Sequence, residues 1–218
     1  NTDLTWQIFV KVGAVGGTIL SYSTTTTFAV VNSLTLTIYV AGSKYDTKHS
    51  LIINKWYQLS FVYLRSKGVL IYHHSNSDNS MVTQKFFVGQ NVLLPGGTLW
   101  LGQWHVTQYQ VNGLPLLPFI GNIDNIRMWR TALDDVTVMQ SFTRRVSLNT
   151  EYQTSLWLFD EGEGLAAKNA FEDGEVIYLS PIASRRPSWQ FSYYSQDPPL
   201  DLELPNPKKY NSILQRLA

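Results

Sequence analysis

The sequence has no cysteine in its 218 residues, so disulfide bonds, thiolate metal sites and cysteine nucleophiles are all excluded. It also lacks an apolar run of about 18 residues, the length that would indicate a membrane-spanning helix. Charged residues make up only 15% of the chain, and the formal net charge is +1. Such a balance gives no long-range field that would steer a nucleic acid or an anionic membrane toward the protein.

Signals that would identify the cellular compartment are missing as well. No Asn is followed two positions later by Ser or Thr, which is the acceptor pattern for N-glycosylation. The first residues, Asn1 to Asp3, do not resemble a signal peptide, so we expect the fragment to begin after any targeting segment. The lack of cysteine leaves the redox compartment open.

The chain is rich in apolar and aromatic residues, at 44% and 13%, which is enough to bury the core of one large all-β domain. Between Leu34 and Val40 apolar and polar residues alternate, the pattern of a half-buried strand. Similar runs occur at Leu4–Val12, Thr18–Tyr22, Thr27–Val31, Trp56–Leu64, Val69–His73, Lys85–Val88 and Thr98–Gln103. Turn-forming clusters separate these runs, and many short strands at such spacing indicate a β-sandwich.

One segment, directly after Trp129, has a helical pattern. Acidic residues stand near its start and apolar residues at positions 133, 136 and 139, which predicts a short helix over residues 133–142 that lies on the sandwich. We expect Trp129 itself to be buried as an anchor of the core.

The stretch Gly97–Leu133 carries two motifs, G-T-L-W-L-G-Q at its start and G-N-I-D-N-I-R-M-W-R-T-A-L at its end. A Trp-led strand with a glycine turn begins at Trp56, and Ser155–Gly164 reads S-L-W-L-F-D-E-G-E-G. Over roughly residues 4 to 165 these ordered motifs resemble pentraxin and laminin-G-like domains. The resemblance implies a two-sheet antiparallel jelly-roll sandwich of the concanavalin A-like type, with one short helix near 133–142.

We expect the sandwich domain to cover residues 1–195 and a proline-rich linker or docked tail to cover residues 196–218. Asp197–Pro207 is rich in proline and poorly periodic, and a short helix over Tyr210–Leu217 would close it. Tyr178–Ser192 contains runs that would add further strands, in place of the usual first strand of the family, which is not found before Leu4.

The resemblance also implies a place for calcium, because pentraxins bind paired calcium ions through acidic and amide side chains of two loops. Calcium takes about six to eight oxygen ligands, several of them from carboxylates. Here the first loop, Ser21–Thr27, has no carboxylate, and the second, Gln103–Thr107, has Trp104 and His105 where the family places acidic and amide residues. We therefore predict no pentraxin-type calcium site and no other cofactor.

Two further groups of residues were weighed as metal ligands. The acidic turn at Gly162 offers these carboxylates: Asp160, Glu161, Glu163 and Asp173. They would make a weak cation site at most, and a solvated acidic turn is the favoured interpretation because calcium loops draw on more ligands. His73 and His74 are neighbours on a strand and point to opposite faces, and His49 and His105 lie far from them in the sequence. No histidine metal site is predicted.

Motifs for catalysis do not occur. Sandwich glycosidases need two carboxylates that face one cleft, whereas Asp124 is the only acid on its strand. There is no G-x-S-x-G elbow, and Gly13–Gly17 lacks the lysine and the following helix of a phosphate-binding loop. We therefore predict that the protein is not an enzyme.

The remaining class of function is recognition. The loop that would hold calcium in the family carries Trp104, His105, Tyr109 and Gln110, and aromatic rings beside amides stack on sugars or anchor protein partners. The alternative for Trp104 is a buried plug that packs on the sandwich. As an exposed sheet edge, the Thr24–Thr27 run would allow a homodimer.

The leading hypothesis is a non-enzymatic adhesion or ligand-recognition module of a larger cell-surface or matrix protein, located outside the cell, with a protein or glycan as its partner. A structural spacer or oligomerisation domain without a small ligand is the alternative, and a glycan-processing enzyme comes last. Neither nucleic-acid binding nor direct insertion into a membrane is expected.

Overall fold

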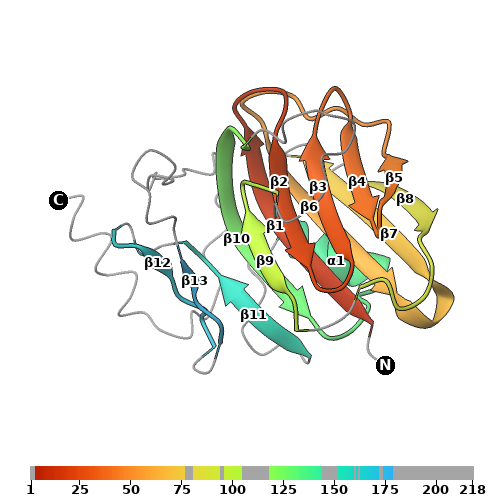
Figure 1. Ribbon diagram of the computed structural model, residues 1–218. Helices are drawn as coiled ribbons and strands as arrows, with labels where there is room; N and C mark the ends of the chain where they lie inside the picture. The colour runs from red at the N-terminus through yellow and green to blue at the C-terminus, as the bar shows by residue number, and fades with distance from the viewer. Residues whose placement is uncertain are drawn as a thin grey trace.

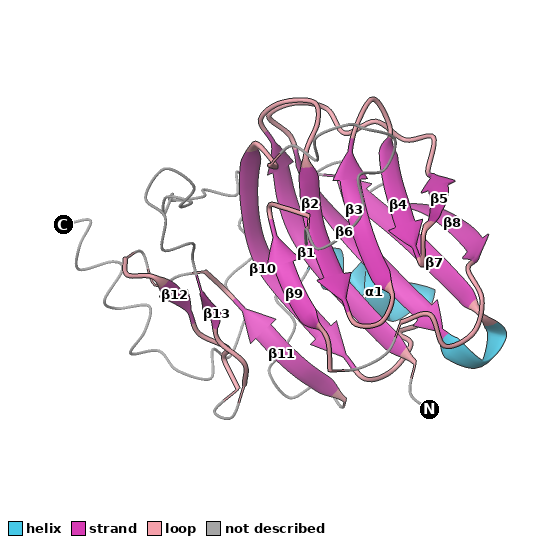
Figure 2. Cartoon of the chain, in the orientation of Figure 1, coloured by secondary structure: helices cyan, strands magenta, loops and turns pink. Residues whose placement is uncertain are grey.

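The computed structural model describes residues 3–76, 81–93, 96–104, 118–143, 152–159, 161, 163–171 and 174–178. Two antiparallel sheets face each other as the layers of a sandwich, and one helix lies on the outer side of the larger sheet (Figure 1). A short two-stranded ribbon lies beyond β11, at one end of the larger sheet (Figure 2). The predicted all-β, two-sheet architecture is confirmed.

The larger sheet has six strands in the order β11-β10-β1-β6-β7-β8. Their bounds are Leu4–Val12 for β1, Trp56–Leu64 for β6, Val69–Asn76 for β7, Met81–Phe87 for β8, Gly121–Trp129 for β10 and Gln153–Trp157 for β11. β6 and β7 form a hairpin, which turns through a short 3-10 helix at Arg65–Lys67 and through Gly68 with a φ of 63°. Glycine is favoured there because other residues rarely adopt this left-handed conformation.

The smaller sheet has five strands in the order β5-β4-β3-β2-β9. Their bounds are Thr18–Ser23 for β2, Thr27–Asn32 for β3, Leu36–Val40 for β4, Ser43–Asp46 for β5 and Thr98–Leu101 for β9. The two-stranded ribbon consists of β12, Ala166–Ala167, and β13, Ile177–Tyr178.

An aromatic cluster joins the two layers at their inner faces. Trp6 of the larger sheet contacts Tyr22 and Phe28 of the smaller sheet edge to face, with 5.0 Å between ring centroids in each pair. Phe28 in turn lies 5.5 Å from Phe61 on β6. All four side chains are buried, and edge-to-face contacts stabilise such pairs beyond the area they bury. The cluster therefore marks the centre of the hydrophobic core.

Most predicted strands are found close to their predicted bounds, but one expectation about the strands is wrong. Thr24–Thr26 is the turn between β2 and β3, where the Thr24 N–H donates to the Thr26 carbonyl at 2.9 Å. Both of these strands pair on each side, so the Thr24–Thr27 run is not a sheet edge; β5 and β9 are the edges of this sheet. Strand β5 was not predicted, because its residues, Ser43–Asp46, are mostly exposed.

The helix α1, Asp135–Thr143, confirms the predicted helix but not its predicted buried face. Its start is set by Asp134, whose carboxylate accepts the Thr137 N–H at 2.7 Å. Val136 and Met139, expected to face the sandwich, are 58% and 45% exposed, whereas Val138 is fully buried. The helix therefore presents a different face to the sheet than its apolar pattern indicates.

The helix α1 buries this face because a row of polar side chains lies on the outer face of the larger sheet. The register aligns Gln7 with Arg127 on one side and with Ser60 on the other, and continues through His73 to Thr83. These five residues come from five neighbouring strands, and all but Thr83 are buried. We call this set the polar row. Buried polar groups need hydrogen-bond partners, so a polar helix face fits here better than an apolar one.

Ser141 of α1 supplies several of those partners. Its hydroxyl accepts hydrogen bonds from the side-chain amides of Gln7 and Gln58, at 2.7 and 3.2 Å, and donates to the Val138 carbonyl at 2.6 Å. The Ser141 carbonyl accepts from the Arg127 guanidinium at 3.3 Å. Through this one residue the helix is hydrogen-bonded to three strands of the larger sheet.

Trp129 is buried as predicted, with 1% of its surface exposed, but not in the core between the sheets. It pairs in register with Thr5, whose hydroxyl accepts the Leu133 N–H at 3.0 Å and donates to the Thr131 carbonyl at 2.8 Å. Thr5 belongs to the same outer face as the polar row, so Trp129 anchors the segment that leads from β10 into α1.

The predicted strands beyond residue 178 and the predicted tail over residues 196–218 lie outside the described residues. The domain boundary at residue 195 therefore stays a prediction. Among the described residues, no helix is long and apolar enough to cross a lipid bilayer.

Replacing Ser141 with alanine is expected to lower the free energy of unfolding by about 1–3 kcal/mol, because the side-chain amides of Gln7 and Gln58 would lose their buried acceptor. Met139→Ala is the matched control on the exposed side of α1 and should change it by less than about 0.5 kcal/mol. Chemical denaturation followed by circular dichroism measures both values. Equal stabilities of the two variants would contradict this account of helix docking.

Candidate functional site

A row of side chains crosses the outer face of the smaller sheet. The register places Trp100 of β9 beside Ser21 of β2, then Ala29 of β3, Tyr39 of β4 and Lys44 of β5. Trp100 and Tyr39 are partly exposed, Lys44 is exposed, and Ser21 and Ala29 are fully buried. Another segment of the chain therefore covers Ser21 and Ala29, in the middle of this row.

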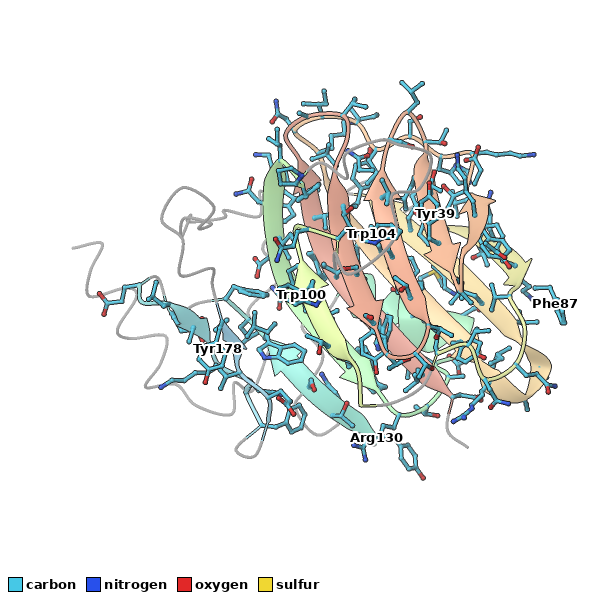
Figure 3. The ribbon with its side chains drawn as sticks, viewed as in Figure 1. Tyr39, Phe87, Trp100, Trp104, Arg130 and Tyr178 are labelled. Carbon is cyan, nitrogen blue, oxygen red and sulfur yellow. The ribbon has the colours of Figure 1, made fainter. Side chains whose placement is uncertain are left out.

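The covering segment is Gln103–Trp104, which follows β9. The Ser21 hydroxyl donates to the Gln103 carbonyl at 3.0 Å, and the Trp104 ring meets the Tyr39 ring edge to face with 5.3 Å between centroids. Figure 3 shows Trp100, Trp104 and Tyr39 in a line across the smaller sheet. We call the surface formed by these three rings, Ser21 and Gln103 the Trp104 face.

Two glycines of the G-T-L-W-L-G-Q motif place this segment. At Gly97 a Cβ atom would lie 2.5 Å from the Ser23 carbonyl oxygen and 2.6 Å from the Tyr22 ring, so only glycine allows β9 to approach β2 this closely. The Gly97 N–H also donates to the Tyr22 hydroxyl at 2.8 Å. Gly102 has a φ of 70°, a left-handed conformation that turns the chain back over the sheet after β9.

The structure describes one of the four predicted ligand-binding residues. Trp104 is only 7% exposed, which agrees with the plug that was the alternative to an open ligand contact. His105, Tyr109 and Gln110 lie outside the described residues, so their role in binding stays a prediction. Trp100 and Tyr39 were not predicted as site residues, because only the strand register brings them into one row across this face.

The donor atoms on this face do not fit a calcium site of the pentraxin type. The hydrogen bond between Ser21 and Gln103 shows that one residue of each segment implied by the resemblance meets the other, and Ser21 lies within strand β2. Yet the residues described in these loops, Ser21–Thr27 and Gln103–Trp104, contain no carboxylate. Calcium needs several carboxylate oxygens, and hydroxyl and carbonyl groups alone would bind it poorly.

The acidic turn is described in part. Glu161 accepts the Lys168 N–H at 2.7 Å, and Glu163 is exposed to solvent. Asp160 and Asp173 lie outside the described residues, so the interpretation of this turn as a solvated acidic turn stays a prediction. Within the described part of the chain, no cluster of three or more His, Cys, Asp or Glu side chains could hold a metal ion.

The histidines differ from expectation in one respect. His73 and His74 point to opposite faces of β7, as predicted: His73 belongs to the polar row, and His74 faces the inner side. However, His49, which was expected to have no partner, lies against His74, with 4.8 Å between ring centroids. His49 follows β5 of the smaller sheet, so this contact links the two layers.

Burial shifts the pKa of both histidines on β7. For His74, burial and the neighbouring His49 lower the pKa from 6.5 to about 4. For His73, burial lowers the pKa, and the Asp135 carboxylate, 3.8 Å from Nε2, opposes this in part. Both imidazoles are therefore favoured in the neutral form in the folded protein.

Comparison with solved structures supports the fold. A Bacteroides ovatus protein for which carbohydrate binding has been proposed matches with a TM-score of 0.57 at 15% identity, over 80% of this chain and 50% of that one. The LG1-3 region of the laminin α2 chain matches with a TM-score of 0.50 at 11% identity, over 62% of this chain and 28% of that one. A heptameric SAP-like pentraxin from Limulus polyphemus has a TM-score of 0.47 at 18% identity, over 69% of this chain and 73% of that one.

No protein-family model and no curated protein sequence matches the chain. The chain spans half the length of the Bacteroides ovatus protein and less than a third of the laminin region. At sequence identities this low, structural similarity shows a common fold and nothing more. Together with the two-sheet topology, it shows that the chain has the pentraxin and laminin-G-like fold.

The lowered pKa of His74 predicts a loss of stability in acid. Between pH 6.5 and about 4 the unfolded chain binds a proton that folded His74 does not, so the free energy of unfolding falls as the pH is lowered through this window. One such group contributes a slope of at most about 1.4 kcal/mol per pH unit. His74→Phe keeps a ring in place, and its slope should be smaller than that of the wild type.

Urea denaturation at a series of pH values, in the presence of a metal chelator, measures these slopes. His73→Asn tests the second buried imidazole separately. Parallel curves for the wild type and His74→Phe would contradict the lowered pKa of His74.

Proposed function

We propose that this chain is a non-enzymatic recognition module of a larger extracellular or cell-surface protein, and that it binds a glycan on the Trp104 face. The observation that carries the proposal is the partly exposed aromatic pair, Trp100 and Tyr39, on either side of the buried Trp104. Aromatic rings held rigidly on strands bind the apolar faces of sugar rings with little loss of conformational entropy.

The polar groups around these rings suit the same class of ligand. Thr98 is exposed, and Ser23 and Thr27 are partly exposed; the register places all three in a row next to that of Trp100 and Tyr39. Hydroxyl groups both donate and accept hydrogen bonds, as sugar hydroxyls do. Lys44 at the far end of the row adds one exposed positive charge.

The chemistry of this face favours binding over catalysis. Among the described residues on the outer side of the smaller sheet, Asp46 is the only carboxylate, and its Oδ1 atom accepts the Lys48 N–H at 2.7 Å. Glycoside hydrolysis requires two carboxylates on opposite sides of one bond. A single exposed acid at the sheet edge cannot supply both an acid and a nucleophile or base.

The extracellular location and the larger host protein are also part of this proposal. The supporting observations are the fold and the fact that the chain spans only part of the Bacteroides ovatus protein and of the laminin region that it resembles. The carbohydrate binding proposed for the Bacteroides ovatus protein supports a glycan by analogy of fold. A protein ligand on the same face is the nearest variant of the proposal.

The test is a glycan array with the purified protein, followed by titration of the best glycan. Trp100→Ala and Tyr39→Ala should each weaken binding about tenfold, the loss expected for one stacked ring. Phe87→Ala is the control, because Phe87 is an aromatic residue of β8 in the other sheet and is 74% exposed. Trp104 is left unchanged, since removing a buried ring would also destabilise the fold.

Unchanged affinity in both variants would exclude the Trp104 face as the binding surface. A protein that binds no glycan and no cell-surface protein, but forms a stable dimer in light scattering, would instead support the spacer or oligomerisation domain.

A further inference from the structure

The contact between His49 and His74 brings together two potential metal ligands from different layers of the sandwich. The planes of their rings are inclined at 59°, and 4.8 Å separates the ring centroids. Each ring is partly buried. The pair lies on the inner side of β7, away from the Trp104 face, and plays no part in the function proposed above.

Both histidines are held by rigid backbone. The His49 carbonyl accepts the Leu36 N–H at 2.7 Å, and the His49 N–H donates to the Thr47 hydroxyl at 3.3 Å. His74 is paired with Leu59 of β6 on one side and with Val82 of β8 on the other. The two imidazoles are therefore positioned before any ligand binds, which lowers the entropic cost of binding.

A third polar side chain, Gln84 of β8, reaches the same place. Its Nε2 atom lies 3.2 Å from Nε2 of His49. Rotation of the amide by half a turn exchanges its oxygen and nitrogen, so the carbonyl oxygen of Gln84 can equally face His49. An amide carbonyl is an acceptable oxygen ligand for a divalent metal ion.

One acceptor atom of this group, Nδ1 of His74, is buried and has no hydrogen-bond partner among the described residues. Oε1 of Gln84 is also buried without such a partner in the orientation in which the amide Nε2 faces His49. The hydroxyl of Tyr72, whose ring lies 5.7 Å from that of His74, is in the same situation. Each buried polar group without a partner costs about 1–3 kcal/mol. A cation bound among these atoms would remove part of that cost.

The spacing suits tetrahedral coordination. With bonds of about 2.0–2.1 Å from zinc to nitrogen or oxygen, two ligand atoms lie about 3.3 Å apart, and two imidazole ring centres lie about 5 Å apart. The observed 3.2 Å between the His49 and Gln84 side-chain atoms and the 4.8 Å between the His49 and His74 rings match both values. Imidazole nitrogen is a preferred ligand of zinc.

We propose that His49, His74 and Gln84 form a zinc-binding site that ties the segment after β5 to strands β7 and β8, and so links the two sheets. Three protein ligands leave the fourth position of a tetrahedral ion for a water molecule. The site has two histidines and one amide as ligands, and no carboxylate or thiolate.

Isothermal titration of the tag-free protein with zinc chloride tests the site directly. One zinc ion should bind per chain and should raise the melting temperature, because zinc binds the folded state. Calcium chloride is the control ion and should leave the melting temperature unchanged, because calcium disfavours nitrogen ligands. In NMR spectra the imidazole signals of His49 and His74 should shift with zinc, and those of His73 should not.

The variants separate a metal site from a purely structural contact. His49→Phe and His74→Phe keep a ring in place but remove the nitrogen ligands, and each should weaken zinc binding about tenfold or more. His73→Asn, the neighbouring histidine on the opposite face of β7, should leave zinc affinity unchanged. Gln84→Glu should tighten binding, since a carboxylate is a stronger zinc ligand than an amide.

The tighter binding of Gln84→Glu does not depend on whether the two phenylalanine variants remain stable, so the proposal can be tested even if they unfold. Zinc affinity that is the same in the wild type, His49→Phe and His74→Phe would overturn the proposal. So would the lack of saturable zinc binding by both the wild type and Gln84→Glu.

Discussion

The contacts of Trp6 with Tyr22 and Phe28 hold the two layers together, and both candidate sites are built outward from them. On one side, the Tyr22 hydroxyl accepts the Gly97 N–H and so helps to fix β9, which carries Trp100 and leads to Trp104. On the other side, the aromatic cluster continues through Phe61 and Tyr72, stacked at 5.5 Å, to His74. A change in the spacing of the layers would therefore disturb both places.

The sequence predicts the strands well where burial alone decides the pattern. Leu4–Val12 and Trp56–Leu64 are found with the predicted bounds because most of their side chains are buried. It predicts the buried face of α1 poorly, since the sheet beneath that helix is polar and Ser141 replaces the expected apolar contacts. The pairing of His49 with His74 was missed because periodicity reports on one strand at a time and carries no information on which side chains meet across the layers.

On the Trp104 face, contacts between neutral groups hold the segment after β9 against the smaller sheet. A hydroxyl-to-carbonyl hydrogen bond joins Ser21 of β2 to Gln103, and an edge-to-face ring contact joins Tyr39 of β4 to Trp104. Such contacts do not depend on the ion content of the surroundings. They also leave the neighbouring rings of Trp100 and Tyr39 partly open to solvent.

The polar row also bears on how the chain folds as it is synthesised. Strands β1, β6, β7 and β8 leave the ribosome well before α1, and they can pair while their outer face still meets water. Because Gln7, Ser60 and His73 are polar, that face presents less apolar surface before α1 packs on it than an all-apolar sheet face would.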